Sequence, residues 1–70
     1  MQEEIFEVKG EFIELCNLLK LTGIAQSGGQ GKAMVADGLV LVNGEIELRK
    51  TAKIHAGQIV ECFDTKITVV

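Results

Sequence analysis

The apolar residues between positions 11 and 21 recur at intervals of three and four, which is the spacing of a helix with one buried face. Glu11 and Glu14 fall in the first turn of this predicted helix, where carboxylates interact favourably with the helix dipole. Gly23 is expected to end the helix, because glycine readily adopts the conformation that follows a last turn. The predicted buried face consists of Phe12, Leu15, Cys16, Leu18 and Leu19.

A second, short helix is predicted to begin after Ser27 and to end at Asp37 and Gly38. Ser27 stands three residues before Gln30, so its hydroxyl can accept the Gln30 amide proton while the Gln30 side chain reaches back. Met34 and Val35 are expected to point inward. Because only a short glycine-containing segment separates the two helices, we expect them to form an angled pair.

Residues 39–48 give the strongest local signal, because β-forming residues flank Asn43-Gly44, the preferred pair for a two-residue type I′ turn. Such a turn would pair Val42 with Glu45 and position 41 with position 46, and would extend to a Leu39–Leu48 pair. Alternation along both strands then predicts that one face is buried. The members of that face are Leu39, Leu41, Ile46 and Leu48.

Three further strands are predicted over residues 3–8, 59–63 and 66–70, where β-formers lie between turn residues. The expected fold is therefore α+β, with two short angled helices packed on a small strand-rich element of about five short strands. At 70 residues the chain has room for one domain only, spanning 1–70.

Composition narrows the possible functions. A chain of this length buries little core, which argues against a deep substrate cavity and favours a binding module over an enzyme. No stretch has the roughly 20 apolar residues of a membrane span, and the acidic N-terminus is unlike a secretory signal, so we expect a cytoplasmic protein. Cys16 and Cys62 are predicted to be buried thiols, because two cysteines and His55 are too few soft ligands for a structural zinc site.

The formal net charge is −3, but the charge is unevenly distributed. Residues 1–14 contain five glutamates and one lysine, for a net charge of −4, whereas residues 15–70 carry +1. Such asymmetry suggests a surface with two electrical faces. A surface of scattered, merely solvated cations is the alternative interpretation at this point.

Two catalytic motifs fail. The segment from Ser27 to Lys32 has Gln26 and Ala33 where a phosphate-binding P-loop needs glycine and Ser or Thr. His55 has no accompanying nucleophile and acid in a recognisable pattern. We therefore expect no catalytic residue, no metal and no cofactor.

The remaining functional signal in the sequence is a set of hydrogen-bond donors and cations that could bind an anion. The Ser27 hydroxyl and the amides of Gly28 and Gly29 at a helix start have the donor geometry that binds phosphate oxygens. Lys32 stands one turn further along that helix. If the hairpin and the helices pack side by side, further cations can line the same surface, namely Lys20, Arg49, Lys50 and Lys53.

Residues 27–44, which read Ser-x-x-Gln-x-Lys-x-x-Val-x-x-Gly-x-Val-x-Val-Asn-Gly, resemble the core motif of the RNA-binding domain named after small-subunit ribosomal protein S4. The match continues through Arg49-Lys50, Lys53 and residues 56–58, and backward through residues 14–23. With these stretches included, residues 11–63 are similar to the stand-alone YbcJ-like bacterial proteins.

This resemblance implies the alpha-L RNA-binding motif, a cytoplasmic and ribosome-associated setting, and a monomer that grips structured RNA of the ribosomal or transfer class. The RNA-facing positions of the family carry over to Lys20, Ser27, Gln30, Lys32, Arg49, Lys50 and Lys53. The broader family often has Arg-Leu-Asp at the first helix and Ser-Arg at the second, so this chain lacks two of its cations. Gly28 is expected to compensate by letting a phosphate approach the backbone closely.

RNA recognition would then depend on shape and backbone, since RNA duplexes hide base edges in a deep groove. The absence of Trp and Tyr gives little support to base stacking on a sheet. The alternative function is a protein-interaction adaptor, which would dock a ribosomal or RNA-modifying protein through the acidic face. Cross-linking in cell extract with and without ribonuclease would separate the two functions.

Overall fold

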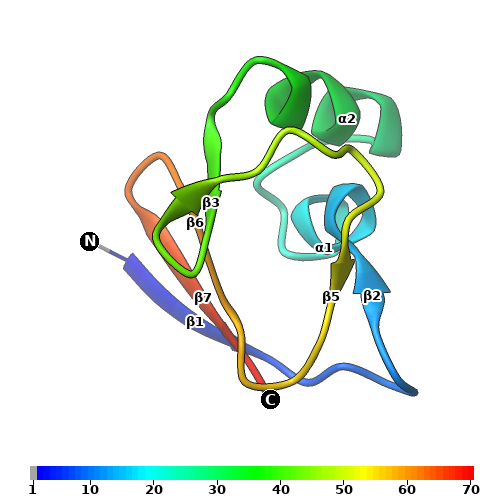
Figure 1. The fold of residues 1–70 in the computed structure, drawn as a ribbon, viewed down its shortest axis with the longest axis vertical. Helices are drawn as coiled ribbons and strands as arrows, with labels where there is room; N and C mark the ends of the chain where they lie inside the picture. The colour runs from blue at the N-terminus through cyan, green and yellow to red at the C-terminus, as the bar shows by residue number, and fades with distance from the viewer. Residues whose placement is uncertain (1) are drawn as a thin grey trace.

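The computed structural model describes residues 2–70, in which five strands form one mixed sheet (Figure 1). Its order is β1-β7-β6-β3-β4; β1 runs parallel to β7, and the other neighbouring pairs are antiparallel. These are the five strands that the sequence predicts. Their bounds are β1 (Gln2–Phe6), β3 (Val40–Val42), β4 (Glu45–Ile46), β6 (Ile59–Cys62) and β7 (Thr65–Val69).

The predicted hairpin between β3 and β4 is confirmed. Val42 pairs with Glu45 and Leu41 pairs with Ile46, and the turn residues Asn43 and Gly44 both have positive φ, at 52° and 84°. A type I′ turn requires positive φ at both central positions, which explains the Asn-Gly pair. The Leu39–Leu48 pair was wrong, because β3 begins at Val40 and β4 ends at Ile46.

The buried face of the hairpin was also predicted wrongly. Val40 is fully buried, whereas Ile46 and Leu48 are 62% and 59% exposed and Leu39 is also exposed. The reason is the second neighbour of β3, which is β6, where Val40 pairs with Cys62. That pairing turns the valine face of β3 toward the core and leaves the leucine face outside.

The first helix, α1 (Leu15–Leu21), begins later than the predicted residue 11. Residues 13 and 14 instead form β2 (Ile13–Glu14), which pairs antiparallel with β5 (Lys53–Ile54). Neither short strand was predicted. Glu11 and Glu14 therefore do not lie in the first turn of the helix. The first amides of the helix instead donate to backbone carbonyls of residues 50 and 52. The helix stops as expected before Gly23, which has φ of 84°.

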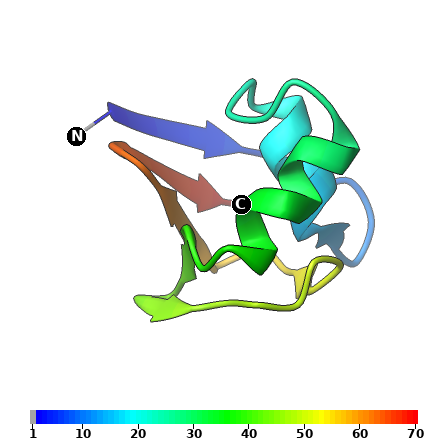
Figure 2. The same ribbon diagram turned by 90° about the horizontal axis from the view of Figure 1, so that it is seen from above.

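The second helix, α2 (Gly28–Ala36), confirms the prediction from Ser27 to Asp37, and Met34 and Val35 are buried. Figures 1 and 2 show α1 and α2 side by side at an angle, on one side of the sheet. One apolar cluster joins the helices to the sheet. Its buried members are Leu15, Leu18, Leu19, Ala25, Met34, Val35, Val40, Ala52, Ile54, Val60, Cys62, Ile67 and Val69.

Both cysteines are free and buried, as predicted. Burial raises the pKa of the Cys62 thiol, since it disfavours the thiolate. Among residues 2–70, no three His, Cys, Asp or Glu side chains lie close enough to hold a metal ion. No helix in this part of the chain is long and apolar enough to cross a membrane.

Candidate nucleic-acid interface

The start of α2 has the predicted cap. The Gln30 amide donates to Ser27 Oγ at 3.1 Å, and the Gln30 side chain accepts the amide of Gln26. The Gly31 amide donates to the Ser27 carbonyl at 3.0 Å, which leaves the amides of Gly28 and Gly29 as the unused donors of the first turn. A Cβ at Gly28 would meet no atom within 4 Å, so packing within the fold does not itself require glycine at this position.

Gly31 sets how closely the two helices approach. A Cβ on Gly31 would lie 2.8 Å from the carbonyl oxygen of Cys16, a distance that real Cβ atoms do not tolerate. Glycine at this position therefore lets α2 pack directly on the backbone of α1. Lys32, which is exposed, follows immediately.

The basic loop, residues 49–53, is hydrogen-bonded to the first turn of α1. The amide of Leu15 donates to the Ala52 carbonyl at 2.9 Å, and the amide of Cys16 donates to the Lys50 carbonyl at 3.3 Å. These bonds satisfy two of the donors that a helix start leaves free. Cys16 thus contacts Lys50 through its amide and Gly31 through its carbonyl, which brings the basic loop, α1 and α2 together.

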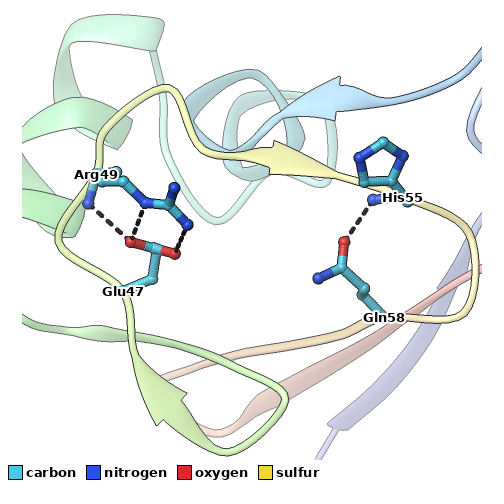
Figure 3. Close-up of polar contacts among 4 residues, drawn as sticks. All are labelled: Glu47, Arg49, His55 and Gln58. Atoms are coloured by element: carbon cyan, nitrogen blue, oxygen red, sulfur yellow. Dashed lines mark hydrogen bonds and ion pairs between the residues drawn. The ribbon is translucent and has the colours of Figure 1, made fainter.

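Arg49 is not a free cation. Its Nε and one terminal nitrogen donate to the two carboxylate oxygens of Glu47 at 3.0 and 2.9 Å, and its amide also donates to that carboxylate (Figure 3). The guanidinium hydrogen bond is the main cause that lowers the pKa of Glu47 to about 2. The Arg49 side chain is still 80% exposed, so its remaining donors face solvent.

Lys53 and two aromatic side chains form a cluster on the β2–β5 ladder. Lys53 Nζ lies 5.0 Å from the centroid of the Phe12 ring, a cation–π distance. The His55 ring is 6.1 Å from Phe12, and its Nδ1 lies 2.8 Å from the Glu11 carbonyl oxygen. Because a carbonyl only accepts, Nδ1 carries the proton of that bond. The His55 backbone is fixed as well, since its amide donates to the Gln58 side chain (Figure 3).

Sequence reasoning assigned Phe12 to the buried face of a helix and treated His55 as an isolated side chain. The antiparallel pairing of Ile13 with Ile54 and of Glu14 with Lys53 instead places Phe12 opposite His55 and diagonal to Lys53 on one face of the ladder. A signal was present in the sequence, because Phe12 precedes a possible strand and Lys53-Ile54-His55 resembles a β segment, but the register is set by tertiary contacts.

The predicted site residues fall into three groups. Ser27, Gly28, Gln30 and Lys32 lie at the start of α2, and Arg49, Lys50 and Lys53 lie on or beside the basic loop. Lys20 lies in the last turn of α1, at the opposite end of that helix from the basic loop. Gly28 is half-buried and the other seven are exposed.

The chain is similar to a known family and to named relatives. A family model described as the S4 domain matches residues 6–70. The Escherichia coli protein named "Putative RNA-binding protein YbcJ" is 47% identical over 62 residues, which cover 89% of each chain. The Bacillus subtilis protein named "Probable ribosome maturation protein RlbA" is 41% identical over 51 residues, covering 73% of this chain and 72% of that protein.

The fold is also similar to a solved structure. The solution structure of E. coli YbcJ superposes with a TM-score of 0.72 at 45% sequence identity, covering 94% of this chain and 85% of that one. Its description reports an alpha-L motif involved in RNA binding. The predicted fold class is therefore confirmed, and the likeness extends over both helices and the sheet.

Proposed function

Because this chain belongs to the S4 domain family, we propose that it is a non-catalytic module that binds structured RNA through the phosphate backbone. The names of its relatives support RNA as the ligand. The observation that carries the proposal is the junction at Cys16, where the Lys50 carbonyl and Gly31 contact the same residue of α1. This junction fixes the basic loop beside the helix whose start offers free amides and Lys32.

The binding surface consists of Lys20, Ser27, Gly28, Gln30, Lys32, Arg49, Lys50 and Lys53. We infer that the lysines supply most of the charge, since Glu47 already neutralises part of Arg49. The contacts are to phosphate and sugar, so recognition follows RNA shape more than sequence. Among RNAs of the ribosomal and transfer classes, the name of the B. subtilis relative favours ribosomal RNA. The module acts as a monomer.

The adaptor function remains the alternative for the acidic N-terminal segment. Glu3 and Glu7 are exposed, and β1 is an edge strand of the sheet. The comparisons name RNA and ribosome maturation, which does not favour this function. Cross-linking in extract separates the two, since a protein contact survives ribonuclease and an RNA contact does not.

The experiment measures RNA affinity against salt concentration. If four or five cations contact phosphates, log K falls with log salt at a slope of about −3 to −4. The double variant Lys50→Ala with Lys53→Ala should bind every structured RNA more weakly and flatten this slope by about 1.5. A salt-independent affinity, or an unchanged slope in the double variant, would remove the electrostatic basis of the proposal.

A control is available in Lys66, which lies on β7 in the five-stranded sheet and is not one of the predicted site residues. Lys66→Ala removes the same charge as Lys50→Ala. Equal losses in the two single variants would mean that net charge alone, and not the proposed surface, determines binding.

A further inference from the structure

A groove of about 350 Å³ lies beside the proposed surface, on a part of the molecule that sequence reasoning did not consider. It is lined by Phe6, Glu7, Lys9, Phe12, Ile13 and Leu21. Its volume is near the lower end of the range for small-ligand pockets, which is about 300–1,000 Å³. The groove therefore suits a single flat ring system better than a larger ligand.

The walls of the groove are apolar and accessible. Phe12 is 36% exposed and Leu21 is 64% exposed, although both are large apolar side chains. Phe6 and Ile13 are half-buried beneath them and pack against the core. The groove thus has a fixed apolar base, an exposed aromatic ring on one wall and a single carboxylate, that of Glu7.

One lysine of the proposed RNA surface adjoins this groove. Lys53 Nζ lies over the ring of Phe12 at 5.0 Å from the centroid. A second cation, Lys9, lines the groove itself. The apolar walls are therefore continuous with groups that bind phosphate.

We propose that this groove binds one unpaired nucleobase of an RNA whose backbone is held by Lys53 and Lys9, an inference that rests on the proposed function. A nucleotide combines a flat ring that stacks on aromatic side chains with an anionic phosphate, which matches an apolar groove beside lysines. The Glu7 carboxylate can accept from the N–H groups that every base carries on its pairing edge. An apolar protein side chain would fill the groove but leave these lysines unused.

The test compares two RNA hairpins that differ by one unpaired adenine, replaced by fluorescent 2-aminopurine for a second readout. The wild-type protein should bind the bulged hairpin more tightly and change the 2-aminopurine emission. Phe12→Leu keeps an apolar side chain but removes the aromatic face, so it should weaken binding of the bulged hairpin about fivefold to tenfold, given the usual worth of base–aromatic stacking. Its affinity for the fully paired hairpin should fall much less, because that RNA places no base in the groove and loses only the support that Phe12 gives to Lys53.

Phe63→Leu is the matched control, because Phe63 is exposed in the β6–β7 turn and does not line this groove. It should behave as wild type with both hairpins. Equal binding of the two hairpins by wild type, or an equal loss for both in Phe12→Leu, would overturn the proposal while leaving the RNA-binding function intact. Retained binding of both hairpins by Phe12→Leu, together with loss of a ribonuclease-resistant protein contact, would assign the groove to a protein side chain instead.

Discussion

Gly31 of α2 lies against Cys16 of α1 so closely that a Cβ at position 31 would be 2.8 Å from the Cys16 carbonyl oxygen. The obstacle is backbone, which cannot rotate away as a side chain can. The carbonyl of Cys16 thus lies against α2, while the amide N–H of Cys16 donates a hydrogen bond to the Lys50 carbonyl of the basic loop. The arrangement of the interface therefore depends on one helix crossing.

Gly31→Ala should consequently destabilise the protein by about 1–3 kcal/mol, the usual penalty for overpacking, despite the better helix propensity of alanine. Gly29→Ala is the control, because a Cβ there would meet only Ser27 Oγ at 3.9 Å. It should be neutral or stabilising by up to about 1 kcal/mol. Urea unfolding of both variants checks this, and equal midpoints would show that the crossing tolerates a methyl group.

Ser27 is expected to have two roles that a pair of substitutions can separate. Its hydroxyl caps α2 through the Gln30 amide, and Ser27→Ala should cost about 1 kcal/mol of stability. Ser27→Asp can keep that cap while placing a negative charge beside the amides of Gly28 and Gly29. It should therefore retain stability but bind RNA more weakly than wild type. Unimpaired RNA binding by a stable Ser27→Asp protein would contradict phosphate binding at this helix start.

Much of the sheet follows from local pattern. The Asn43-Gly44 turn fixes the pairing of Val42 with Glu45, because the turn type dictates the register. Alternation does not reveal which face is covered, since both faces of β3 are apolar. The glutamates at positions 45 and 47 led to the prediction that the leucine face is buried. The pairing of β3 with β6 instead places Val40 beside the buried Cys62, so the valine face belongs to the core.

The start of α1 is a second feature that local sequence pattern does not determine. The three-and-four spacing that includes Phe12 is real, but it fits equally well a helix that begins at Leu15. The pairing of Ile13 with Ile54, far along the chain, makes the helix begin late, and no local pattern reports that contact. The candidate site could likewise be predicted only in part. Residue types and motif spacing identified its cations. The Glu47–Arg49 ion pair and the contact of Lys53 with Phe12 depend on how the loop folds.

The Glu47–Arg49 pair gives a pH prediction with a definite sign. The pKa of Glu47 is lowered from 4.5 to about 2, so its contribution to stability is full above pH 4.5 and is lost as the pH falls toward 2. Both groups contact solvent, so the effect on stability should be small and should shrink in salt. A carboxyl NMR titration should place the Glu47 midpoint near 2, and Arg49→Ala should return it toward 4.5. Identical midpoints in the two proteins would mean that the pair does not persist in solution.

Glu47 should also restrain RNA binding. While the carboxylate accepts two hydrogen bonds from the Arg49 guanidinium, that group has fewer donors and less net charge to offer a phosphate. Glu47→Gln should therefore strengthen RNA binding severalfold at low salt and steepen the salt slope by about 0.7 to 0.9, the value for one added phosphate contact. Glu3→Gln makes the same change in net charge on β1, at the opposite edge of the sheet from β4, and should leave the slope unchanged. An equal gain in both variants would assign the effect to net charge and leave Arg49 outside the set of phosphate contacts.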